Sequence, residues 1–178
     1  DEDVSASGGG TITFAGGLRI DVDTGVGLGG ANNVGTLAIV TDAGNVSFTD
    51  SDALTVGTVD GVSGISTTNA GSGANIDVNV TSNGLTVDQA VATTDGSVVL
   101  NAASGNVDVN ANVDGTTTID VTVGGDDNTL TVAATITSTG GAHTYTADEM
   151  MLGGTINATG QRVILAPESA GDAGDAID

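Results

Sequence analysis

Short segments of alternating apolar and polar residues fill the chain, and turn residues separate them. Segments such as Ile76–Val80 and Ile119–Val123 place every second side chain on one face, as β-strands do. Gly, Asp, Asn and Ser bound these segments. No stretch of about 11 to 18 residues has the roughly 3.6-residue period of an amphipathic helix. The pattern therefore predicts an all-β protein with essentially no helix.

Equivalent strands recur at a nearly constant interval. One family of strands begins at Ile76, Val98, Ile119, His143 and Val163. A second family begins at Leu54, Leu85, Val107, Leu130 and Met150. The second family carries a further apolar residue, four positions after its second apolar residue, at Val91, Val113, Ile136 and Ile156, and one residue early at Val59. The two families interleave in fixed order, so each repeat supplies two strands, a short third strand and turns.

This periodicity predicts a parallel β-helix, or β-solenoid, with about 20–24 residues per coil. Coils stack about 4.8 Å apart, so roughly eight coils would form a rod about 40 Å long. The alternative is a pair of tandem immunoglobulin-like β-sandwiches, which are also rich in short strands. Such sandwiches have no need for equivalence at this spacing and usually carry a core aromatic residue. The chain has no Trp and 1 Tyr, which favours the solenoid.

We expect residues 1–178 to form a single β-solenoid segment that is less regular in 1–45. Two segments are expected to be loops that protrude from it, at 25–34 and 61–74. The first is rich in glycine, and the second fills the long interval that follows Leu54. Equivalent positions should stack along the rod, so that Asn79 lies next to Asn101 and Asp77 shares an outward column with Asp120.

Charge narrows the list of partners. Two basic and 23 acidic residues give the chain a net charge of −21, a field that repels nucleic acid and anionic membranes. There are no cysteines, hence no disulfide, thiolate metal site or cysteine nucleophile. No apolar run approaches the roughly 20 residues that span a bilayer, so no membrane insertion is expected. No signal peptide opens the sequence, so we expect a mature chain or part of a longer one.

Three segments resemble the repeats of very large bacterial surface proteins. They are 54–65 (LTVGTVDGVSGI), 96–110 (GSVVLNAASGNVDVN) and 154–167 (GTINATGQRVILAP), the last followed by AGDAID at 173–178. The resemblance covers residues 36–178 and is to filamentous-haemagglutinin-like and autotransporter-passenger-like exoproteins. It implies a right-handed parallel β-helix, secretion, and a role in adhesion, biofilm or cell-surface structure.

One turn is a candidate metal site. Residues 124–130 read GGDDNTL and resemble half of a calcium-binding nonapeptide repeat. Carboxylate and carbonyl oxygens suit Ca²⁺, so Asp126, Asp127 and Asn128 are the candidate ligands. The motif occurs once and lacks the family spacing, so an acidic turn is the alternative. Calcium is the one cofactor that we consider.

Candidate catalytic groups are sparse. Asp77, Asp120 and the neighbouring Asp108 could in principle act as a carboxylate pair on a polysaccharide, but basic and aromatic partners for a sugar are few. His143 stands in an apolar column without a second histidine, so we interpret it as a packing residue. We therefore expect no enzyme activity.

The sequence predicts a non-catalytic structural module of a secreted bacterial cell-surface or filament protein, an adhesin shaft that could assemble end to end. The expected partners are neighbouring copies or the rest of a longer chain, and the expected location is extracellular or at the bacterial cell surface. Two alternatives stay open. One is an adhesin module that binds a cell-surface glycan or receptor through its loops, and the other is a β-helical enzyme acting on polysaccharide.

Overall fold

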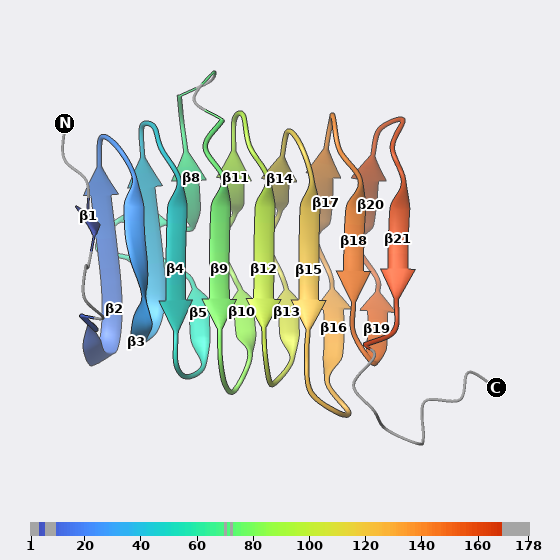
Figure 1. Ribbon diagram of the computed structural model, residues 1–178, viewed down its shortest axis with the longest axis horizontal. Coiled ribbons are helices and arrows are strands. Elements are labelled where there is room, and N and C mark those ends of the chain that lie inside the picture. The colour runs from blue at the N-terminus through green and yellow to red at the C-terminus, as the bar shows by residue number, and fades with distance from the viewer. Residues whose placement is uncertain (1–3, 6–9, 70, 72, 169–178) are drawn as a thin grey trace.

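The chain is a parallel β-solenoid, as predicted, and it makes about seven turns. The computed structural model describes residues 4–5, 10–69, 71 and 73–168. Within these residues there are strands, turns and loops but no helix, and hence no helix that could cross a bilayer. Figure 1 shows strands in the foreground running down and strands behind them running up as the chain advances from the N- to the C-terminal end, so the solenoid is right-handed.

Three stacks of parallel strands form the walls. The first stack is β4 (Val46–Asp50), β9 (Ile76–Val80), β12 (Val98–Ala102), β15 (Ile119–Val123), β18 (His143–Thr146) and β21 (Val163–Ala166). The second is β5 (Leu54–Val56), β10 (Leu85–Val87), β13 (Val107–Val109), β16 (Thr129–Val132) and β19 (Glu149–Leu152). The third is β8 (Ile65–Thr67), β11 (Val91–Thr93), β14 (Val113–Gly115), β17 (Thr135–Ser138) and β20 (Thr155–Ala158).

The register of the ladders confirms the repeat read from the sequence. Val98 pairs with both Ile76 and Ile119, and the same column continues to His143 and Val163. In the second stack the paired residues are those of the second sequence family, from Leu54 to Met150. Because strands alternate their side chains, one correct alignment fixes which residues of every coil point inward.

The N-terminal coils are built from longer strands than expected. Two strands of different coils, β2 (Thr13–Val22) and β3 (Val26–Thr41), run side by side, and β1 (Val4–Ser5) pairs with the start of β3. The predicted loop at 25–34 is therefore wrong, because this segment is the first half of β3. The lower regularity expected there corresponds to shifts of register between Phe14 and Gly17 and between Leu28 and Asn32.

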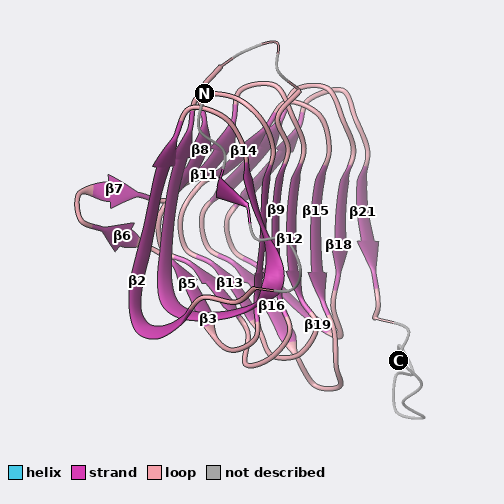
Figure 2. Ribbon diagram, turned by 60° about the vertical axis from the view of Figure 1, so that its left-hand side comes forward, coloured by secondary structure: helices cyan, strands magenta, loops and turns pink. Residues whose placement is uncertain are grey.

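The predicted loop at 61–74 is also corrected. A short antiparallel hairpin, β6 (Thr58–Val59) and β7 (Val62–Ser63), leaves the wall, and the chain then returns as β8 before a second insertion at 68–74. Figure 2 shows the hairpin projecting from the side of the solenoid. Ile65, not Val59, is the residue that pairs with Val91. These insertions lengthen one coil, so the chain makes about seven turns rather than the eight expected.

The core is a thin column of small aliphatic side chains. Val, Ile and Leu fill most inward positions, and Tyr145 and Phe48 are the largest fully buried side chains. Each inward residue lies on its equivalent in the next coil, so the core consists of continuous apolar columns. The first and last coils that the structure describes each stack on a single described coil.

Candidate functional site

The C-terminal coil exposes side chains that are buried in every other coil. Val163 and Leu165 stack on His143 and Tyr145, which are fully buried, yet they are 45% and 55% exposed. In the same coil Leu152 and Ile156 are only partly buried. These residues occupy inward positions that no further described coil covers, so the described part of the chain ends in an apolar surface, which we call the C-terminal end face.

Polar columns run along the outside of the first stack. The Asn101 Nδ2 donates to the Asn79 Oδ1 of the preceding coil at 3.1 Å, which confirms the predicted contact. Asp77 and Asp120 share a column with Val99 between them, also as predicted. Two coil steps place their backbones about 10 Å apart, the upper limit of the carboxylate spacing in inverting glycosidases. Asp108 is on β13, in a different wall.

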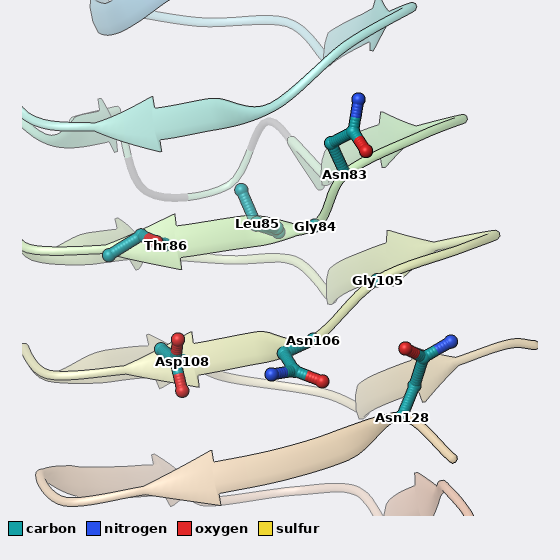
Figure 3. A pocket seen from close by; sticks show the side chains of 8 residues that line it. All are labelled: Asn83, Gly84, Leu85, Thr86, Gly105, Asn106, Asp108 and Asn128. Atoms are coloured by element: carbon teal, nitrogen blue, oxygen red, sulfur yellow. The ribbon is translucent and has the colours of Figure 1, made fainter. Parts of the chain in front are cut away.

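An open groove of about 350 Å³ follows the corner that leads into β10, β13 and β16. Figure 3 shows Asn83, Asn106 and Asn128 on three consecutive coils along it, with Asp108 further along β13. The Oδ1 of Asn106 accepts the Thr129 N–H at 2.9 Å, so its amide hydrogens stay available. The amides of Asn83 and Asn128 already donate, to Asp52 and to the carbonyls of Gly124 and Gly125. The Asn106 amide and the nearby Asp108 carboxylate are therefore the groups that can hydrogen-bond a ligand rich in hydroxyl groups.

The candidate calcium turn is held by its own side chains. Asn128 Nδ2 donates to the carbonyl oxygens of Gly124 at 2.8 Å and Gly125 at 3.0 Å. The Asp127 N–H donates to Asp148 Oδ2 at 2.9 Å, and Asp127 has a positive φ of 61°. Asn128 thus occupies two carbonyl oxygens that could serve Ca²⁺. Among the residues that the structure describes, no three His, Cys, Asp or Glu side chains come together as a metal site.

A buried hydrogen-bonded chain that the sequence analysis missed surrounds His143. Ser138 Oγ donates to the Gly141 carbonyl at 2.9 Å, and His143 Nε2 lies 2.7 Å from the same Oγ. With its hydrogen committed to Gly141, Ser138 accepts the Nε2 hydrogen. His143 Nδ1 then accepts the hydroxyl of Tyr145 at 2.9 Å. This arrangement fixes the neutral tautomer with Nε2 protonated.

Burial determines the protonation states of His143 and Tyr145. Removal from water lowers the pKa of His143, although the carboxylate of Asp120 opposes the shift. Burial also raises the pKa of Tyr145, which therefore stays neutral. All three side chains are buried, so none can reach a substrate in solution. The alternation of His143 and Tyr145 at inward positions of one strand was the sequence signal for their contact.

A second buried polar pair lies near the N-terminal end. Asn32 and Asp50 are opposite each other in adjacent coils, and both are fully buried. The predicted loop at 25–34 hid this pair, because Asn32 was assigned to an exposed segment. The parity of Val46, Phe48 and Asp50 was the available signal that Asp50 points inward.

In comparisons with protein-family models, curated proteins and solved structures, nothing matches this chain.

Proposed function

We propose that this chain is a non-catalytic structural module, the shaft of a secreted bacterial cell-surface or filament protein. The observation that carries the proposal is the in-register ladder of the first wall, which joins Val26 to Val163 through every intervening coil. Backbone hydrogen bonds along the axis resist both bending and extension, because every coil must part from two neighbours to move.

Two further features support a shaft. The net charge of −21 keeps the walls of such a rod from associating side by side. The polar groups that are buried, around Asn32 and His143, are engaged in hydrogen bonds within the wall and core. The resemblance of segments 54–65, 96–110 and 154–167 to surface exoproteins gives the proposal its location.

Electron microscopy of the purified 178-residue chain tests the shape, and a polysaccharide screen tests the absence of catalysis. Seven turns predict particles about 35 Å long that are narrower than they are long. Incubation with acidic and neutral polysaccharides should release no new chain ends. Compact round particles would contradict the shaft. Release of chain ends that is abolished in Asp77→Asn would instead support the enzyme.

The open groove favours a second candidate function, recognition of a glycan. Asn83, Asn106 and Asn128 repeat along the corner at the coil spacing, and Asn106 has free donors beside the acceptors of Asp108. Binding to a panel of immobilised neutral oligosaccharides tests it. Asn106→Ala should lose any binding that Asn157→Ala, an exposed asparagine in the last coil, retains. Equal loss in both variants would contradict a site at the groove.

A further inference from the structure

The two ends of the solenoid are related by the same columns that run through its core. Leu18 heads a column that passes through Leu37 and Val56 and ends at Leu152. Ile20 heads a second column, through Ile39 and Ile65, that ends at Ile156. A further solenoid stacked by one coil step on the C-terminal end face would therefore place apolar side chains on apolar side chains.

The N-terminal coil is open in a matching way. Leu18 and Val22 are only partly buried, although they point inward, and Ile20 keeps 6% of its surface exposed. We call Leu18, Ile20 and Val22 the N-terminal end face. The bulge of β2 lies between Phe14 and Gly17, so the regular part of the strand begins at Gly17 and includes Leu18. This regular part is the segment that the core columns reach.

The open strand edges also match in direction. At the N-terminal end β1 belongs to the same wall as β21. The long strand β2 begins both of the other walls, the one that ends at β19 and the one that ends at β20. All of these ladders are parallel. A second copy in the same orientation would therefore continue each wall with the hydrogen-bonding pattern that the chain already uses between its own coils.

Charge distinguishes the ends from the rest of the rod. The chain has only two basic residues, and they lie in its two terminal coils: Arg19 in β2 and Arg162 immediately before β21. Arg19 pairs with Asp21 at 2.7 Å, whereas Arg162 has no carboxylate partner among the described residues. In a rod with 23 acidic residues, cations at the ends reduce repulsion where two copies would meet.

From these observations we infer that the C-terminal end face binds the N-terminal end face of a second copy, so that the chains stack head to tail. The inference rests on the proposed shaft function and names its partner. Leu152 packs on the partner copy's Leu18, and Ile156 packs on its Ile20. Because the two faces differ, the contact is heterologous and each added copy leaves a new free end, which produces an open filament rather than a closed dimer.

Sedimentation velocity over a concentration series, with electron microscopy of the same samples, tests the inference on the whole chain. The informative pair of variants is Leu165→Asp and Ile164→Asp. Both place one carboxylate in β21. Leu165 occupies the inward position that stacks on Tyr145 and is left uncovered at the end face, whereas Ile164, 38% exposed, faces outward from the wall. A carboxylate buried at the joint should weaken association more than tenfold, since each 1.4 kcal/mol is about tenfold and desolvating a charge costs several times that.

Arg162 supplies an independent readout. Arg162→Glu should weaken association at low ionic strength and recover at about 0.5 M salt, where the Debye length is only a few ångströms. At low ionic strength Arg162→Gln should associate more strongly than Arg162→Glu and more weakly than the unchanged protein. Leu165→Asp should stay weak at both ionic strengths, because its defect is desolvation and not long-range repulsion.

The outcomes separate the inference from the proposal beneath it. Head-to-tail stacking is supported if the rods lengthen in whole multiples of one particle. It also requires that Leu165→Asp shortens these rods and Ile164→Asp does not. Intact single rods that stay monomeric at all concentrations and salt levels overturn the inference but leave the shaft in place. Side-by-side rafts, or equal effects of the two aspartates, also overturn it. Particles that are not rods overturn both.

Discussion

Asn32 and Asp50 face each other across two adjacent coils, and both side chains are fully buried. The Asn32 amide donates to the carbonyl oxygens of Leu28 at 2.9 Å and Thr49 at 2.8 Å, and its oxygen accepts the Ile12 N–H at 2.9 Å. Asn32 therefore joins three consecutive coils where β3 shifts its register. A side chain is needed there because the shift leaves backbone groups without ladder partners.

Asp50 completes the same corner. Its Oδ2 accepts the Val34 N–H at 3.0 Å, and its Oδ1 accepts the Asp52 N–H at 3.0 Å. Burial raises the pKa of Asp50, while these two backbone donors lower it. The direction of the net shift shows that desolvation exceeds the hydrogen bonds.

Replacing Asn32 by alanine should destabilise the protein by about 2–4 kcal/mol, because several buried backbone groups lose their partner together. Asn33→Ala is the matched control, since Asn33 is the adjacent residue of β3, is half-buried and makes no side-chain hydrogen bond in the described structure. Urea unfolding followed by circular dichroism measures the difference. Equal losses in the two variants would contradict a special role for Asn32.

His143 predicts a pH dependence of stability. The pKa of His143 is lowered in the folded state, so in the unfolded chain the imidazole takes up a proton near the ordinary pKa of 6.5, while in the folded protein the imidazole stays neutral. The unfolded state then binds more protons, and stability falls as the pH drops below about 6.5. Above that pH the contribution is fully present. The chain has a single histidine, so its one imidazole signal in NMR should titrate below the ordinary value.

The hydrogen-bonded chain itself can be tested by a mutant cycle. His143→Val should cost about 1–3 kcal/mol, because the buried hydroxyl of Tyr145 loses its acceptor. Adding Tyr145→Phe removes that hydroxyl and should recover most of the loss. The double variant should also lose the dependence of stability on pH between about 5.5 and 7. A double variant that is less stable than His143→Val would count against this account.

The repeat was predictable because inward residues of a solenoid stack on their equivalents. Aligning Leu85, Val107 and Leu130 by sequence spacing alone gave the register that the ladders show. Local composition was a poorer guide. The segment 25–34 contains four glycines, yet it forms β3 because neighbouring strands on both sides supply its hydrogen bonds.

The buried polar groups were harder to predict. Asn32 and Ser138 depend on how corners bring separate turns together, which the spacing of apolar residues does not specify. The outward columns were easier, because Asn79 and Asn101 follow directly from the strand register. The end faces follow from the same register, but which coils are terminal is apparent only in the folded chain.

The β6–β7 hairpin is an insertion that the solenoid can lose. Between Val87 and Val91 the chain uses three residues to reach the next wall, and between Val56 and Ile65 it uses eight. Deleting residues 58–62 leaves three residues in that interval, and Gly57 and Gly64 already meet through a 2.8 Å hydrogen bond. We expect the fold to survive, with the unfolding free energy changed by about 1 kcal/mol or less.

Thermal unfolding and particle shape test the deletion together. A change of that size corresponds to about 2–4 °C in Tm for a chain of this length. The same variant tests receptor recognition by the hairpin. If the hairpin binds a receptor, its deletion should lower adhesion to cells while the rod remains intact. Loss of the rod would show that packing of Val59 over Gly17 is essential to the N-terminal coils.

Gly96 is required by the spacing between coils. A Cβ at this position would collide with the carbonyl oxygen of Ala74 in the preceding coil. The carbonyl of Gly96 also accepts the N–H groups of Thr116 at 3.0 Å and Thr117 at 3.1 Å in the following coil. A side chain here would therefore push apart coils that are hydrogen-bonded through this residue.

Gly96→Ala should accordingly cost about 1–3 kcal/mol, the usual effect of inserting an atom into a close-packed site. Gly29→Ala is the control, since Gly29 is an exposed residue of β3 and a Cβ there would have no atom within 4 Å. That change should be neutral or stabilising by up to about 1 kcal/mol, because glycine in a strand loses more backbone entropy than alanine on folding. Urea unfolding measures the free energy of unfolding of both variants. If Gly96 is needed for the spacing between coils, Gly96→Ala lowers this free energy and Gly29→Ala leaves it unchanged or raises it.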